Sequence, residues 1–189
     1  MKFWIFTTLL RLPSVFFGVL SVLMVYALGR CIFGEKIAML SSFFLAVSPG
    51  NTYFSGEIRS YALLTFLSFS SVYFFFRFLE NKTRPSGLSL YVLSTLLCLY
   101  THYLGIFVVI VEGVFLLLKN DVRGKKIKTW LKAKCVILIF YIPWLFALQR
   151  QARHLGRIAM FADYSPLGLL KIYTHGLEVF YGGEWLFQI

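Results

Sequence analysis

Glu57 and Arg59 lie two residues apart in the segment 53–61, and they are the only charged residues between positions 37 and 76. A carboxylate here could act as a base, hold a metal ion or orient a hydroxyl group. A guanidinium could bind a phosphate through two parallel hydrogen bonds. Alternatively, Glu57 and Arg59 only anchor the helix ends at the membrane interface, because arginine side chains readily extend to a membrane surface. Both interpretations stay open on residue type alone.

Two other ionisable side chains interrupt apolar sequence. His102 lies at a polar break, 101–103, inside the apolar stretch 88–118. It either approaches Glu57 and Arg59 in space or serves as a hydrogen-bonded packing residue. Glu112 lies within the same stretch, as a buried polar contact or as part of a pathway, and the sequence names no partner for it.

The composition is that of an integral membrane protein. The 189 residues are 59% hydrophobic and only 14% charged, whereas a soluble domain is about one-quarter charged. The net charge of +11 does not indicate nucleic-acid binding, because seven of the nineteen basic residues lie in one segment, 119–134. Such a segment beside a membrane helix more simply faces the cytoplasm and anionic lipid. The three cysteines are far apart and indicate neither a disulfide framework nor a zinc site.

The apolar runs predict an all-α, polytopic transmembrane helical bundle with about six spans. The second run, 37–55, should kink or stop at Pro49. The stretch 88–118 would form a helix of about 46 Å, which is too long for a hydrocarbon core of about 30 Å. We therefore expect two short helices there, meeting at 101–103. The predicted spans are 12–29, 37–55, 61–76, 88–101, 103–118 and 135–148.

The distribution of basic residues predicts the orientation of this bundle. With the break at 101–103, the loops 30–36, 77–87 and 119–134 share one side and hold twelve basic residues, whereas the opposite turns hold only Arg59. The positive-inside rule then makes the basic side cytoplasmic and puts Glu57 and Arg59 on the outer face.

The same layout predicts two domains and an incomplete chain. Residues 1–150 form the transmembrane helical domain, and the more polar residues 151–189 form an extracytoplasmic loop with a short amphipathic helix. Met1 would lie outside the cytoplasm, although residues 1–11 lack the features of a secretory signal. We therefore expect the chain to be a fragment that lacks an upstream helix.

A succession of short motifs over residues 9–150 resembles the membrane glycosyltransferases of the GT-C fold. It is closest to the dolichyl-phosphate-mannose protein mannosyltransferase and aminoarabinose-transferase-like group. In order, the motifs are Arg11-Leu12-Pro13-Ser14, Val25-Tyr26, Gly29-Arg30, Phe33-Gly34, Ser48-Pro49, Glu57-Ile58-Arg59-Ser60-Tyr61-Ala62-Leu63, Tyr100-Thr101-His102-Tyr103 and Ile142-Pro143-Trp144.

The resemblance implies an enzyme that moves a sugar from a polyprenyl-phosphate carrier to an acceptor hydroxyl at the outer or lumenal membrane face. It implies that Glu57 is a catalytic carboxylate and that Arg59, Tyr61 and His102 bind substrate near the carrier phosphate. The cofactor is left open, with a divalent metal among the options. The family's main catalytic carboxylate lies in a first outer loop that this sequence does not contain, so this chain alone is expected to be incomplete.

The implied partners are a polyprenyl-phosphate-linked sugar, membrane lipid and an acceptor protein or glycan, with no nucleic acid. The implied location is a bacterial or archaeal plasma membrane, or the endoplasmic reticulum. Two other functions stay open. One is a transporter or flippase fragment that uses Glu57, His102 and Glu112 as a path; transporters place such groups near the midplane of the membrane. The other is a non-catalytic membrane subunit.

Overall fold

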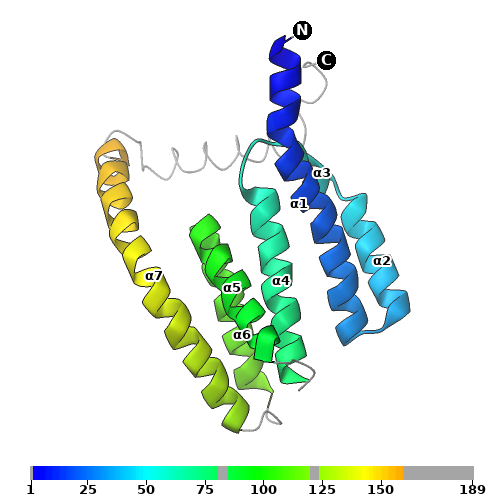
Figure 1. The fold of residues 1–189 in the computed structure, drawn as a ribbon, viewed down its shortest axis with the longest axis vertical. Coiled ribbons are helices and arrows are strands. Elements are labelled where there is room, and N and C mark those ends of the chain that lie inside the picture. Colours follow the sequence, from blue (N-terminus) through cyan, green and yellow to red (C-terminus); the bar gives the residue numbers. More distant parts are fainter. Residues whose placement is uncertain (1, 81–84, 120–123, 160–189) are drawn as a thin grey trace, which may run out of the picture. The chain divides into compact units, whose positions relative to one another are not determined.

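The computed structural model describes residues 2–80, 85–119 and 124–159, and these residues form helices joined by short turns (Figure 1). The all-α prediction is therefore confirmed for this part of the chain. The elements are α1 (Lys2–Ile32), α2 (Glu35–Ala46), α3 (Pro49–Gly56), α4 (Tyr61–Leu79), α5 (Pro85–Thr101), the short 3-10 helix η1 (Tyr103–Gly105), α6 (Ile106–Leu118) and α7 (Gly124–Ala159).

The chain divides into two compact units, Met1–Trp144 and Leu145–Ile189. The helices α1 to α6 and the first part of α7 belong to the first unit. The predicted domain boundary at residue 150 remains a prediction. Of the segment 151–189, which was predicted to be an extracytoplasmic loop with an amphipathic helix, residues 160–189 lie outside the described residues.

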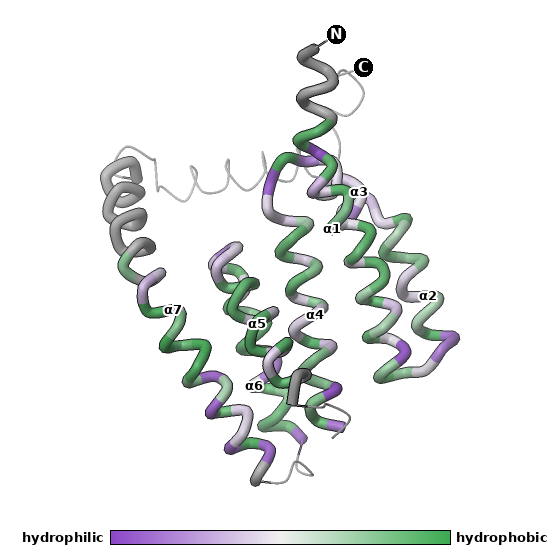
Figure 2. Tube along the Cα trace, viewed as in Figure 1, coloured by the Kyte–Doolittle hydropathy of each residue, from purple (hydrophilic) through white to green (hydrophobic). Residues whose placement is uncertain are grey.

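Two of the described helices have the length and hydropathy of a full membrane span, over Leu9–Ile32 and Tyr61–Leu79. Two shorter apolar helices cover Gly87–Thr101 and Tyr103–Leu118. Figure 2 shows the apolar colouring along the helices and the polar residues gathered towards their ends. With 12 residues, α2 is only about 18 Å long, which is short for a hydrocarbon core of about 30 Å. By length and hydropathy, two helices of the described residues thus qualify as full spans, and the number of about six spans stays a prediction.

The predicted stop in the second apolar run is confirmed. Helix α2 ends at Ala46, and α3 begins at Pro49. Ser48 caps α3, because its Oγ accepts a hydrogen bond from the Asn51 amide at 3.4 Å. Proline is favoured in the first turn of a helix, where its missing N–H has no partner to lose. The sequence Ser48-Pro49 therefore both ends one helix and starts the next.

The predicted break in the stretch 88–118 is also confirmed. Helix α5 ends at Thr101, His102 is extended, and α6 starts at Ile106. The imidazole of His102 caps the intervening η1 by accepting a hydrogen bond from the Leu104 amide at 3.2 Å. Gly105 permits the tight reversal, because a Cβ at this position would lie 2.8 Å from the Cys98 carbonyl oxygen.

The prediction for the basic segment 119–134 was wrong. It was expected to be a loop that precedes a span at 135–148, but α7 already begins at Gly124 and continues to Ala159. The reason is an apolar stripe that extends back into the basic residues: Ala133 and Ile137 are buried, and Trp130 packs against the core. Their spacing of three and four residues is helical. Lys134, counted above as a loop residue, therefore belongs to a packed helix.

The core of the first unit joins α4, α5, α6 and α7. Its buried members are Phe75, Leu79, Tyr91, Leu116 and Ala133. Lys126, near the start of α7, donates a hydrogen bond to the Leu79 carbonyl at the end of α4. In Figure 1 the α1–α2 turn lies at this same end of the unit. The basic turns thus share one end, as predicted, whereas the assignment of that end to the cytoplasm stays a prediction.

Candidate functional site

Glu57 and Arg59 form an ion pair in the turn between α3 and α4. Arg59 Nε lies 3.4 Å from Glu57 Oε2, and the two side chains are 67% and 28% exposed. The Tyr53 hydroxyl donates to Glu57 Oε1 at 2.7 Å. This hydrogen bond is the main cause of a raised pKa of Tyr53, because ionisation of the phenol would lose it. Glu57 is thus held between a phenol and a guanidinium, with one carboxylate oxygen towards each.

Close packing against α1 positions this turn. A Cβ added to Gly18 of α1 would lie 2.0 Å from Ser55 Oγ, so only glycine lets α3 approach this closely. One helical turn earlier on α1, Ser14 Oγ donates a long hydrogen bond of 3.5 Å to the Arg59 carbonyl oxygen. Helix α1 therefore holds the backbone of the ion pair at two points, Ser55 before Glu57 and the Arg59 carbonyl after it.

A series of ring contacts connects this turn to the break between α5 and α6. The ring centroids are 5.1 Å apart for Phe54 and Tyr61 and 5.7 Å apart for Tyr61 and His102. His102 then contacts Tyr103 at 4.2 Å. The structure thus brings Tyr61 and His102 together, next to the helix that leads into Glu57. Sequence reasoning named these two residues and missed Phe54 and Tyr103, although their aromatic type at the outer turns was visible.

His102 has a structural role as well as a place beside Tyr61. Its Nδ1 accepts from the Leu104 amide, so the proton of the neutral imidazole lies on Nε2. The ring can therefore donate one hydrogen bond from Nε2 to a ligand. The packing alternative and the binding alternative for His102 are both compatible with this arrangement.

Residues 6–146 match the family model described as dolichyl-phosphate-mannose-protein mannosyltransferase. The chain belongs to this family. The match contains Glu57, Arg59, Tyr61 and His102, and it confirms the resemblance drawn from the motifs. By this family membership, the protein is a membrane glycosyltransferase of the mannosyltransferase kind. No curated protein and no solved structure matches the chain.

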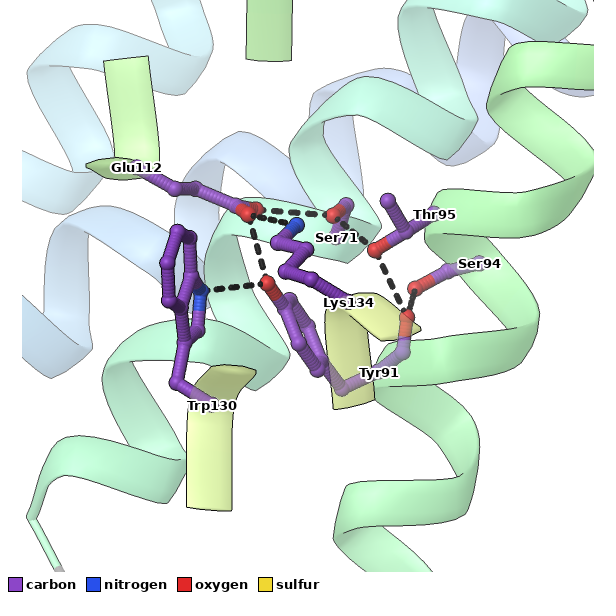
Figure 3. A network of polar contacts seen from close by, with 7 residues as sticks. All are labelled: Ser71, Tyr91, Ser94, Thr95, Glu112, Trp130 and Lys134. Carbon is purple, nitrogen blue, oxygen red and sulfur yellow. Dashed lines mark hydrogen bonds and ion pairs between the residues drawn. The ribbon is translucent and has the colours of Figure 1, made fainter. Parts of the chain in front are cut away.

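The mannosyltransferase chain contains a second polar cluster, which is buried around Glu112 (Figure 3). Lys134 Nζ lies 2.7 Å from Glu112 Oε2, and their side chains are 14% and 1% exposed. Tyr91 donates to Glu112 Oε2 at 2.6 Å, and Ser71 donates to Oε1 at 2.9 Å. Trp130 Nε1 donates to the Tyr91 hydroxyl at 2.9 Å. The sequence left Glu112 without a partner because Lys134 was assigned to a loop.

The described residues contain no group of three or more His, Cys, Asp or Glu side chains that could hold a metal ion. At the outer turns, Glu57 and His102 are the side chains of a type that binds metals. These two side chains do not by themselves make a metal centre.

Proposed function

We propose that this chain carries the carrier-phosphate side of a glycosyl-transfer site. A sugar passes from a polyprenyl-phosphate carrier to an acceptor hydroxyl at the extracytoplasmic face. The observation that supports this most is the gathering of Glu57, Arg59, Tyr61 and His102 at the turns opposite the basic end of the unit. Family membership supplies the reaction class.

Arg59 is the proposed phosphate ligand. Its ion pair engages Nε, and a guanidinium presents five donors in a fixed plane, so the terminal nitrogens can bind two phosphate oxygens. The bond between the anomeric carbon and the phosphate oxygen breaks, and its electron pair stays on the phosphate. Arg59 then stabilises the charge that builds up on this leaving group.

Glu57 is the proposed catalytic carboxylate of this part of the site. Its contacts with Tyr53 and Arg59 hold it as a hydrogen-bond acceptor in a fixed orientation. In that position it orients the guanidinium on the carrier phosphate and can accept a hydrogen bond from the incoming hydroxyl. The acceptor oxygen forms the new bond to the anomeric carbon, and its proton passes to the Glu57 carboxylate.

Tyr61 and His102 are the proposed substrate-binding neighbours. The Nε2 proton of His102 suits a phosphate or sugar oxygen, and the Tyr61 ring packs against the imidazole and limits its rotation. The carrier lipid would reach this turn sideways from the bilayer, and the acceptor protein or glycan would approach from the extracytoplasmic side. The basic residues at the opposite end of the unit support this choice of face.

The test is sugar transfer from labelled polyprenyl-phosphate mannose in membranes that contain the protein expressed from its whole gene, with any upstream segment that the gene encodes, at matched expression. Arg59→Lys keeps the charge and loses the planar fork, so transfer should fall by tenfold or more. Glu57→Gln should also lower it. Equal transfer by wild type and both variants would contradict the proposed site, and no transfer by the wild-type protein from the whole gene would contradict the proposed function.

The chain offers a matched control at the other end of α1. Arg30 Nε lies 3.1 Å from Glu35 Oε2, with side chains 65% and 53% exposed, and the Tyr26 hydroxyl donates to Glu35. This group repeats the Tyr53–Glu57–Arg59 arrangement. Arg30 is sixteen residues after Ser14 on the same helix, which is roughly 24 Å along the axis. Arg30→Lys should therefore leave transfer unchanged.

A further inference from the structure

The residues of the buried cluster around Glu112 come from helices that follow one another along the chain, from α4 to α7. Ser71, Tyr91 and Glu112 belong to α4, α5 and α6, and all precede α7. Both carboxylate oxygens of Glu112 already have a donor from these three helices, Ser71 on Oε1 and Tyr91 on Oε2. The helices α4 to α6 can therefore hold the carboxylate in place before α7 is added.

Helix α7 contributes the opposite charge. Lys134 lies ten residues after Gly124, roughly 15 Å into the helix. Its Nζ contacts Glu112 and also lies over the rings of Tyr91 and Trp130, 4.9 Å and 5.3 Å from their centroids. The ammonium group is thus surrounded by one carboxylate and two aromatic faces, both of which favour a cation.

The environment makes each charge costly without the other. An unpaired lysine or glutamate inside a membrane bundle is strongly unfavourable, and such groups normally occur as pairs. Exposed apolar side chains follow Lys134 on α7, among them Leu138, Ile139 and Phe140. Basic residues precede it, with Lys128 and Lys132 both exposed. Lys134 therefore lies where the basic part of α7 gives way to its apolar part.

We propose that Glu112 and Lys134 form an insertion lock. Helix α7 enters the membrane, with Lys134 at its set depth, because α6 presents Glu112 as the partner. The insertion of α7 thereby depends on the correct assembly of α4, α5 and α6. Trp130 adds a hydrogen bond from α7 to the Tyr91 hydroxyl. Further along α7, near its middle, the Phe140 carbonyl accepts a hydrogen bond from Tyr100 at 2.6 Å.

The experiment measures the side of the membrane on which the far end of α7 lies. The full chain carries Ala152→Cys as its single cysteine, with Cys31, Cys98 and Cys135 replaced by serine or alanine. A membrane-impermeant maleimide labels it from the side opposite the basic end when α7 is inserted. Glu112→Gln leaves Lys134 unpaired and should lower this labelling at least tenfold. Lys132→Met, on an exposed neighbour of the same helix, is the control and should leave labelling unchanged.

The double variant separates the lock from a general loss of folding. Glu112→Gln/Lys134→Met removes both charges and should restore both labelling and accumulation of the chain, even if Glu112→Gln alone fails to accumulate. Wild-type labelling of the Glu112→Gln chain would overturn the proposal, because α7 would then insert without its partner. A double variant as poor as the single one would also overturn it, because the defect would not arise from the unpaired lysine.

Discussion

The chain holds two acid–base pairs that use similar groups in opposite surroundings. Glu57 and Arg59 are 3.4 Å apart in an exposed turn. Glu112 and Lys134 are 2.7 Å apart and largely buried among four helices. An exposed pair contributes about 0–1 kcal/mol to stability, and its donors remain accessible to a ligand. A buried pair lies largely out of reach of a ligand, and loss of one partner leaves a buried charge. The outer pair therefore suits chemistry, and the inner pair suits assembly.

The largest stability effect is expected at the inner pair. Glu112→Gln should lower the free energy of unfolding by about 3–5 kcal/mol, because it leaves the Lys134 ammonium buried without its counter-charge. The double variant Glu112→Gln/Lys134→Met should recover most of this loss. Thermal unfolding in detergent, followed by circular dichroism, gives the comparison. An equal loss in the single and double variants would mean that the pair does not act as a unit.

A smaller effect is expected from Tyr91→Phe. The phenol both donates to Glu112 and accepts from Trp130, so its removal should cost about 1–3 kcal/mol. Tyr73→Phe on α4 removes a hydroxyl outside this network and should change stability much less. The same unfolding measurement on both variants tests this. Similar losses of unfolding free energy in Tyr91→Phe and Tyr73→Phe would mean that the Tyr91 hydroxyl does not stabilise the Glu112–Lys134 pair.

Changes to the outer pair, Glu57 and Arg59, should have little effect on the free energy of unfolding in the same assay. Arg59→Ala and Glu57→Gln should each change the free energy of unfolding by about 0–1 kcal/mol, because the Arg59 side chain is largely exposed and solvent screens the pair. A loss of several kcal/mol from either variant would make the turn a structural element like the inner pair, and the contrast between the two regions would fail.

The smallest effect concerns the titration of Tyr53. Its pKa is raised above the usual 10.0, chiefly by the hydrogen bond to Glu57. The bonded, neutral phenol therefore supports the fold fully below pH 10, and this support is lost as the pH rises through the raised pKa. The difference in phenolate absorbance between wild type and Tyr53→Phe should titrate above pH 10, and Glu57→Gln should move it down. An unchanged titration in Glu57→Gln would argue against the contact.

Local sequence rules predicted the two interruptions of the helices. Ser48-Pro49 combines a cap with a residue that cannot continue a helix, and the length of 88–118 required a break near His102. Both signals depend on backbone chemistry, which is local. The break also placed His102 at the same end of the bundle as Glu57 and Arg59, because two outward turns of one bundle lie at the same end; its contact with Tyr61 was not predicted.

The partner of Glu112 was not predictable from charge alone. Lys134 lies among basic residues that resemble a cytoplasmic loop, and counting them as one group concealed it. The apolar spacing of Trp130, Ala133 and Ile137 was the available signal, since it extends the helix back to Gly124. Which lysine of a basic segment turns inward depends on the face that packs, and this is set by contacts with α5 and α6.

The most direct test measures sugar transfer and folding together on one double variant from each region. Glu57→Gln/Arg59→Lys should keep the unfolding temperature of wild type and lose at least tenfold in transfer from polyprenyl-phosphate mannose. Glu112→Gln/Lys134→Met should retain wild-type transfer per folded molecule. The opposite pattern, full transfer by the outer variant and lost transfer by a folded inner variant, would move the reaction to the buried cluster and contradict this assignment of the two pairs.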